Sequence, residues 1–192
     1  MSTQWRSNPV HLSPPPPKEI LPWLIDAYIL TQTLKKITPN VTLTLVSQQF
    51  DRIDQEEAEA LNLTTPDTAW VRKIFLCCDD RPVSYSRVIV PHKTYLAYQN
   101  KFDSVQKNFI GEFMLYDNPE VRREAFEYCQ MPQSSLLVKE LSAHDAQITL
   151  KPIWARRSCF WINEYPLLIT DSFLPDMPNY PDKTHTMKPE LI

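Results

Sequence analysis

Two charged residues of opposite sign stand at positions where the strand pattern calls for apolar side chains. In the stretch WVRKIFLCC, alternate residues place Arg72 between Trp70 and Ile74, on the row that faces the core. In PLLITDSFLP, the same alternation places Asp171 in the most apolar row of its strand. A buried charge costs several kcal/mol unless an opposite charge meets it, so each residue indicates either a structural partner or a ligand.

Two interpretations of these charges stay open on the pattern alone. In the first, Arg72 and Asp171 form an ion pair inside the core. In the second, they flank a ligand, with the arginine binding a carboxylate through a forked contact and the aspartate binding a hydroxyl group or a proton. Arg87, in YSRVIVP, is either a second cation that faces the same way or a surface residue at a sheet edge.

Both charges lie in predicted β-hairpins. Residues 69–78 and 83–90 flank DDRP, and residues 154–162 and 166–175 flank NEYP. Both linkers contain residues that favour turns, Asp and Pro in one and Asn and Pro in the other. The segment 41–50 is rich in β-branched residues and predicts one more strand. We therefore expect one antiparallel sheet that contains both charges.

Three segments predict helices. Residues 19–37 carry a wide apolar face at helical spacing, and residues 54–63 read as a short acidic helix. Residues 118–130 carry the clearest helix signal, with an Asn–Pro start. The segment 130–152 gives no clear pattern. Strands before and after a helical middle predict an α+β fold, an antiparallel sheet with helices gathered on one side.

Composition excludes several classes of protein. The chain has 192 residues, 43% hydrophobic, with a net charge of -3, which suits one globular domain and argues against nucleic acid as the partner. It has no apolar run of membrane-spanning length and no secretory signal, so we expect a cytoplasmic monomer without membrane insertion. The four cysteines show no metal-ligand spacing, and there is no glycine-rich phosphate loop, so we expect neither a metal nor a nucleotide cofactor.

The chain has 18 prolines but a single glycine, Gly111. The prolines cluster near both ends, which predicts extended arms at 1–18 and 176–192 around a domain at 19–175. With one glycine, most turns must use Pro, Asn and Asp. Gly111 itself is either a helix cap or turn, or a point where the backbone closely approaches a ligand.

The two hairpin sequences, WVRKIFLCCDDRPVSYSRVIVP and WARRSCFWINEYPLLITDSFLP, resemble the signature hairpins of the chorismate lyase family. The family pattern runs W-x-R-x-[IV]-x-L-C, a turn with proline and R-x-[VI]-V-P, then later W-x-R-R-S, a turn, P-L-L-[LI]-T-E and F-L-P. The resemblance covers 70–91 and 154–175 well, and 23–34 and the segment around Gly111 loosely. It implies a six-stranded antiparallel sheet with helices and an internal ligand cavity.

The resemblance also implies a function, that of a bacterial chorismate pyruvate-lyase at the start of ubiquinone synthesis. Such an enzyme eliminates pyruvate from chorismate to give 4-hydroxybenzoate, without a cofactor. The family's carboxylate-binding arginine falls on Arg72, and its acidic residue falls on Asp171. Its apolar and backbone contacts to the ligand fall on Leu30 and Ile110. Gly111 would then be the point where the backbone closes over the ligand.

The sequence departs from the family pattern at two positions. The usual glutamate is the shorter Asp171, and the small residue before the second-strand arginine, often glycine, is Ser86. The shorter acid leaves open an inactive family member. A second alternative is an effector-binding module of the same fold, which senses a small aromatic acid without turnover. Such modules follow a DNA-binding domain, whereas 18 residues precede the first predicted helix here, so we favour the enzyme.

Overall fold

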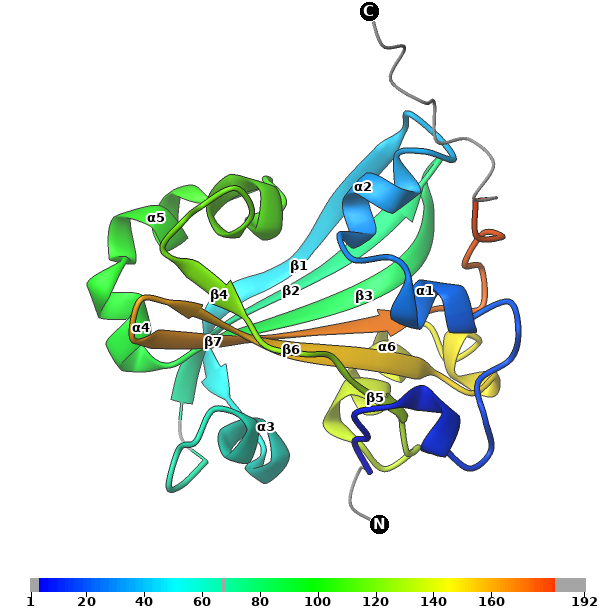
Figure 1. Ribbon diagram of the computed structural model, residues 1–192, viewed down its shortest axis with the longest axis horizontal. Helices are drawn as coiled ribbons and strands as arrows, with labels where there is room; N and C mark the ends of the chain where they lie inside the picture. The colour runs from blue at the N-terminus through cyan, green and yellow to red at the C-terminus, as the bar shows by residue number, and fades with distance from the viewer. Residues whose placement is uncertain (1–3, 67, 182–192) are drawn as a thin grey trace, which may run out of the picture.

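Two long antiparallel hairpins form the centre of the sheet in a computed structural model, which describes residues 4–66 and 68–181 (Figure 1). The first hairpin joins β2 (Thr68–Cys78) to β3 (Arg81–Val90), and the second joins β6 (Trp154–Ile162) to β7 (Tyr165–Phe173). Strand β3 pairs with β7, so the hairpins lie side by side in one sheet. The prediction of both hairpins is confirmed.

The sheet has seven strands among the described residues, one more than the resemblance implied. The order is β1-β2-β3-β7-β6-β4, and β5 pairs with β6 beyond the end of β4. The strand predicted at 41–50 is confirmed as β1. The strands outside the two hairpins are β1 (Val41–Arg52), β4 (Val121–Arg123) and β5 (Glu127–Gln130).

The helix predicted at 118–130 is wrong, because this segment forms β4 and β5. Its Glu, Arg and Ala residues favour a helix, but pairing with the free edge of β6 overrides that local preference. Neighbouring Tyr128 and Cys129 are both buried, in core clusters on opposite faces of the sheet. Such alternation is the mark of a strand covered on both sides.

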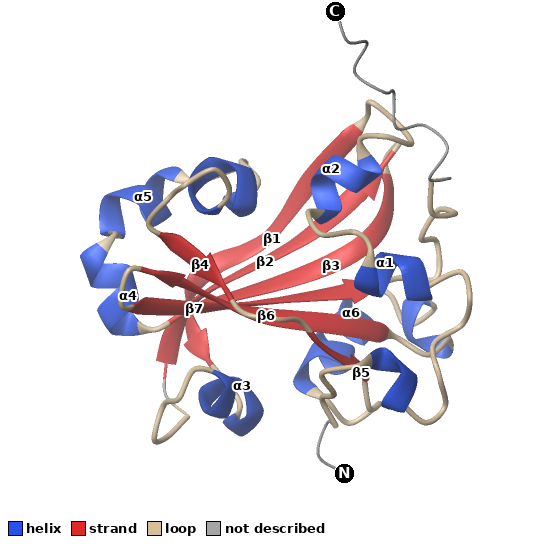
Figure 2. Ribbon diagram, viewed as in Figure 1, coloured by secondary structure: helices blue, strands red, loops and turns tan. Residues whose placement is uncertain are grey.

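Helices cover both faces of the sheet, so the prediction that they gather on one side is wrong (Figure 2). Helices α1 and α2 pack on Ile74 and Leu76, whereas α6 packs on the alternate residues Phe75 and Cys77. Helix α6 lies in the segment that gave no sequence pattern. The helices are α1 (Leu21–Ile25), α2 (Leu30–Leu34), α3 (Gln55–Ala60), α4 (His92–Ala97), α5 (Gln99–Ser104), α6 (Leu136–His144), a π-helix (Gly111–Leu115) and short 3₁₀ turns at Pro9–His11 and Ile148–Leu150.

The single helix predicted at 19–37 is broken into α1 and α2. The carbonyl groups of Trp23 and Leu24 accept hydrogen bonds from Arg156, and the carbonyl of Tyr28 accepts one from Arg123. A continuous helix would pair these carbonyls with its own backbone N–H groups. Two arginines from distant strands therefore take the place of helical hydrogen bonds. The acidic helix predicted at 54–63 is confirmed as α3, which Asp54 caps.

Left-handed backbone occurs without glycine in this chain. Asp79 and Asp80 have φ values of 48° and 64° in the β2–β3 turn, and Asn163 has a φ of 54° in the β6–β7 turn. Asp and Asn tolerate this conformation better than other side chains with a Cβ atom. The prediction that turns use these residues is confirmed, and Gly111 does not have a positive φ.

The segments predicted as arms pack on the folded domain where the structure describes them, the first on strands of the sheet and the second on α1. Arg157 lies 4.3 Å from the ring of Trp5, and Arg6 pairs with Tyr128 through both backbone groups. The carbonyl of Pro178 accepts a hydrogen bond from the Trp23 indole. Residues 182–192 of the predicted C-terminal arm lie outside the described residues. In the described part of the chain, no helix is long and apolar enough to cross a membrane.

Arg87 lies on the sheet face opposite to Arg72, so neither interpretation made for it is correct. Its side chain is 1% exposed. Its Nε atom is 2.6 Å from Glu57, and a terminal nitrogen is 3.1 Å from Glu140. Burial opposes the charge of Arg87, but these two carboxylates more than offset it and raise its pKa. Arg87 is therefore a structural cation.

Replacement of Arg87 by methionine is expected to lower the free energy of unfolding by about 3–5 kcal/mol, because it leaves Glu57 without its buried cation and leaves Glu140 to its ion pair with Lys73. Urea denaturation measures this change. Arg122 is the control, since its side chain is 64% exposed and its ion pair is with exposed Glu124. Arg122→Met is expected to change stability by less than about 0.5 kcal/mol. Equal effects of the two substitutions would contradict the structural role of Arg87.

Candidate active site

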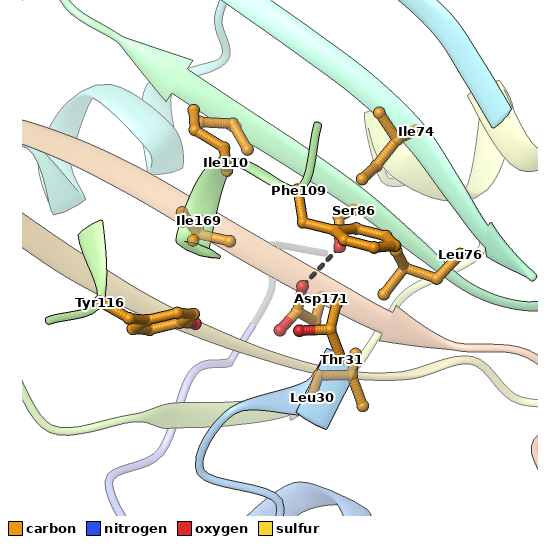
Figure 3. Close-up of a pocket in the computed structure, with 12 residues that line it drawn as sticks. Leu30, Thr31, Ile74, Leu76, Ser86, Phe109, Ile110, Tyr116, Ile169 and Asp171 are labelled. Atoms are coloured by element: carbon orange, nitrogen blue, oxygen red, sulfur yellow. Dashed lines mark hydrogen bonds between the residues drawn. The ribbon is translucent and has the colours of Figure 1, made fainter. Parts of the chain in front are cut away.

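A cavity of about 60 Å³ lies between the sheet and a cover made by α2 and residues 109–116 (Figure 3). Strand residues form its floor, and they are Ile74, Leu76, Ser86, Val88, Ile169 and Asp171. The cover contributes Leu30, Thr31, Phe109, Ile110, Gly111 and Tyr116. The lining is mostly apolar, with a few polar groups facing inward, as is usual for sites that bind small molecules.

Four of the predicted site residues meet at this cavity. Leu30 comes from α2, Ile110 and Gly111 come from the cover segment, and Asp171 comes from β7. Arg72 is not among the residues that line it. The register of the sheet nevertheless places Arg72 directly beside Val88, which does line the cavity. Arg72 therefore lies immediately next to the cavity.

Asp171 is the one carboxylate among the lining residues, and two side chains hold it. The Ser86 hydroxyl donates to Asp171 Oδ1 at 2.5 Å, as Figure 3 shows. The Nε atom of Arg156 lies 3.5 Å from Asp171 Oδ2. Both partners stand directly opposite Asp171 on the neighbouring strands β3 and β6. The sheet itself thus fixes the position of this carboxylate.

Arg156 is a residue of the site that the sequence analysis missed. It is 1% exposed, and one terminal nitrogen donates to the carbonyls of Trp23 and Leu24. Burial lowers its pKa, and nearby Asp171 opposes that effect. A signal was present in WARRSCFWI, where the alternation that singled out Arg72 also places Arg156 between Trp154 and Ser158.

Arg72 is completely buried, and no carboxylate pairs with it among the residues that the structure describes. Its terminal nitrogens donate to Gln48 Oε1 at 2.6 Å and to the Asn108 carbonyl at 2.8 Å, both neutral acceptors. Its Nε atom has no hydrogen-bond partner in the described part of the chain. The ion pair with Asp171 that the sequence left open is not formed, because Asp171 pairs with Arg156 instead.

Burial lowers the pKa of Arg72 to about 10, so the side chain stays charged at neutral pH. Relative to the ordinary value of 12.5, this shift corresponds to a cost of about 3 kcal/mol for the buried charge. The pKa of Arg72 is lower in the folded state than in the unfolded state. The cost of burying its charge is therefore fully present below pH 10, and it falls only as the pH rises through that value. A carboxylate beside Nε would offset this cost.

Gly111 is required by the aromatic ring that packs on it. A Cβ atom at this position would lie 2.2 Å from Cε2 of Tyr116, far inside van der Waals contact. The Tyr116 hydroxyl points toward Asp171 (Figure 3). Burial, together with the charge of Asp171, raises the pKa of Tyr116 to about 12 and keeps its hydroxyl protonated. The sole glycine of the chain therefore allows Tyr116 to form one wall of the cavity.

We expect Gly111→Ala to lower the free energy of unfolding by about 1–2 kcal/mol, because the new methyl group must displace the Tyr116 ring. In a Tyr116→Ala background the same substitution is expected to cost less than about 0.5 kcal/mol, since the clashing ring is gone. A double-mutant cycle measured by urea denaturation gives both values. An equal cost in the two backgrounds would show that Gly111 serves another purpose.

One carboxylate ties the two parts of the cover together. Glu112 of the π-helix accepts hydrogen bonds from Thr31 at 2.8 Å and from Lys35 at 2.8 and 2.9 Å. Although burial raises the pKa of Glu112, these bonds from α2 and its C-terminal cap lower it overall. A dry cavity of roughly 150 Å³ holds benzene. The cavity here has a volume of about 60 Å³, so an aromatic ring can enter it only if this cover moves outward.

The chain was compared with known proteins. The family model described as "Chorismate lyase" matches residues 2–183. A "Probable chorismate pyruvate-lyase" from Psychromonas ingrahamii is 30% identical over 82% of this chain and 83% of that protein. A "Probable chorismate pyruvate-lyase 1" from Pseudomonas entomophila is 32% identical over 79% of this chain and 80% of that protein. The "Chorismate pyruvate-lyase" of Pectobacterium carotovorum is 26% identical over 85% of this chain and 81% of that protein.

Solved structures share the fold at low sequence identity. The C-terminal domain of the histidine utilization repressor from Pseudomonas syringae has a TM-score of 0.52 at 13% identity, covering 75% of this chain and 98% of that chain. The effector-binding domain of the Bacillus subtilis trehalose repressor has a TM-score of 0.50 at 10% identity, covering 77% and 99%. At such identities the likeness shows the fold alone. The family match over nearly the whole chain is the decisive result, and the chain belongs to the chorismate lyase family.

Proposed function

We propose that the protein is a chorismate pyruvate-lyase whose inner cavity converts chorismate to 4-hydroxybenzoate and pyruvate. The observation that carries the assignment of this site is the fully buried Arg72, which has no anionic partner and a free Nε atom among the described residues. It stands directly opposite Val88, which lines the mostly apolar cavity. Chorismate supplies an anion for Arg72, the carboxylate on its cyclohexadiene ring. A guanidinium that is buried before the ligand arrives has already lost its water shell, so its attraction for the carboxylate is strong.

The reaction needs little from the protein beyond position and charge. The carbon–oxygen bond between the ring and the enolpyruvyl group breaks, and the ring loses hydrogen from the neighbouring carbon that carries the hydroxyl. The ring becomes aromatic, and the three-carbon fragment takes the hydrogen and leaves as pyruvate. Binding in an enclosed cavity holds the ether and the hydrogen in reacting geometry, and buried cations neutralise carboxylate charge.

We assign Arg72 to the ring carboxylate and Asp171 to the opposite end of the ring. Ser86 and Arg156 hold Asp171 at the level of the sheet, where its carboxylate can accept a hydrogen bond from the ring hydroxyl or assist proton movement at the ether. Leu30 and Ile110 pack on the two sides of the ring. The aspartate that replaces the family's usual glutamate thus keeps two partners that orient it.

The closed cover has a consequence for turnover. The cavity of about 60 Å³ is smaller than an aromatic acid, so the cover must open for substrate to enter and for product to leave. A dry cavity that fits 4-hydroxybenzoate also retains it. We therefore propose that product release limits the rate. A cytoplasmic location and a monomeric state remain predictions from the sequence.

The test is to mix the purified protein with chorismate and a chelator, and to follow 4-hydroxybenzoate and pyruvate together. Equal amounts of the two products are expected, since one elimination makes both. The rate is expected to be the same with and without the chelator. Formation of 4-hydroxybenzoate without pyruvate would contradict the proposal. Tight binding of 4-hydroxybenzoate without turnover of chorismate would instead support the effector-binding alternative.

A further inference from the structure

A second, larger cleft adjoins the inner cavity. It has a volume of about 480 Å³, and its lining includes Tyr28, Tyr116, Arg123 and Phe160. Tyr116 lines both the inner cavity and this outer cleft, so its side chain forms the partition between them. The outer cleft contains none of the residues assigned to the aromatic ring.

Arg123 gives the outer cleft a fixed positive charge. One terminal nitrogen donates to the Tyr28 carbonyl at 2.8 Å, and the guanidinium lies 3.4 Å from the Tyr28 ring centre and 4.3 Å from that of Phe126. No carboxylate pairs with it among the residues that the structure describes. Its neighbour Arg122, by contrast, pairs with Glu124 and is 64% exposed. Arg123 is therefore held in place by a carbonyl and two aromatic rings, and its charge is not neutralised by a carboxylate of the described residues.

The sheet aligns this cation with the inner site. Arg123 pairs with Phe160 on β6, and Phe160 shares its face of that strand with Arg156, which lies beside Asp171. The charges of Arg156 and Arg123 both oppose the rise in the pKa of Tyr116. The partition thus has a negative charge, Asp171, on its inner side and a positive charge, Arg123, on its outer side.

We propose that Arg123 and the outer cleft bind the second carboxylate of the substrate, that of the enolpyruvyl group, and then the pyruvate formed from it. This inference rests on the proposed function. Chorismate is a dianion, and Arg72 accounts for its ring carboxylate only. A second carboxylate placed beside Asp171 would be repelled, whereas one placed past Tyr116 meets an unpaired cation. The small acid can then leave through the outer cleft while the ring stays enclosed.

The test compares Arg123→Gln with the neighbouring control Arg122→Gln. For Arg123→Gln, the KM for chorismate is expected to rise at least tenfold, while the affinity for 4-hydroxybenzoate changes less than twofold, because the product lacks the second carboxylate. Inhibition of the wild type by added pyruvate is expected to disappear in this variant. Arg123→Lys, which keeps the charge, is expected to recover most of the lost affinity for chorismate. Arg122→Gln is expected to match the wild type.

Two results would overturn the inference. One is an unchanged KM for chorismate in Arg123→Gln. The other is an equal loss of chorismate and 4-hydroxybenzoate affinity, which would indicate general damage to the cover through the lost bond to Tyr28. A wild-type protein that releases no pyruvate from chorismate would remove the proposed function and this inference together. An active wild type with an unaffected Arg123→Gln variant would remove only the role of the outer cleft.

Discussion

Arg72→Ala is expected to lower kcat/KM for chorismate by roughly a hundredfold or more and to weaken 4-hydroxybenzoate binding by well over tenfold. The estimate follows from the loss of a buried, charge-assisted contact, which costs about 2–5 kcal/mol. Steady-state kinetics and titration calorimetry measure the two effects. Arg72→Lys is expected to recover only part of the loss, because an ammonium cannot make the forked contact. Unchanged product affinity in a folded variant would defeat the assignment.

The same arginine is expected to contribute little to stability in the absence of ligand. Within the described ranges its buried charge has neutral acceptors alone, Gln48 and the Asn108 carbonyl. We expect Arg72→Met to leave the free energy of unfolding within about 1 kcal/mol of the wild type, because removal of the charge offsets the lost hydrogen bonds. Arg87→Met, which removes a cation from between two carboxylates, is the matched comparison and is expected to be far more costly. This contrast separates an arginine retained for a ligand from one retained for the fold.

Asp171→Asn is expected to reduce kcat by roughly a hundredfold while changing 4-hydroxybenzoate affinity by less than about fivefold. Turnover falls more than product affinity when the lost group transfers a proton or stabilises charge in the transition state. Asparagine keeps the size of the side chain and can still accept the hydrogen bond from Ser86. Asp171→Glu, which restores the usual family residue, is expected to remain active. Single-turnover kinetics separate the chemical step from product release. An Asn variant as fast as the wild type would reduce Asp171 to a structural partner of Arg156.

The sequence was enough to predict the residues that break a strand pattern. Arg72 and Asp171 interrupt apolar rows in hairpins whose turn residues are explicit, so both the hairpins and the misplaced charges could be predicted from local rules. What each charge meets could not be predicted in this way. The partner of Asp171 is Arg156, and the acceptors of Arg72 come from β1 and from the loop before the cover.

The errors in the fold have the same origin. Residues 118–130 have helical propensity but add two strands to an edge of the sheet, and residues 19–37 are broken where Arg156 and Arg123 take backbone carbonyls. Both outcomes depend on contacts between residues far apart in the chain. Gly111 shows a related limit. The sequence left open a helix cap or turn and a close approach to a ligand, whereas the group that packs on Gly111 in the structure is the Tyr116 ring.

The central claim is that Arg72 binds the carboxylate of an aromatic acid in the inner cavity, and a crystal structure with 4-hydroxybenzoate tests it most directly. We expect the ring between Leu30 and Ile110, its carboxylate within about 3 Å of the Arg72 guanidinium, including Nε, and its hydroxyl in hydrogen-bond distance of Asp171. The cavity is expected to be larger than in the unliganded form. A ligand seated in the outer cleft, or elsewhere with the Arg72 Nε still unpaired, would contradict the account.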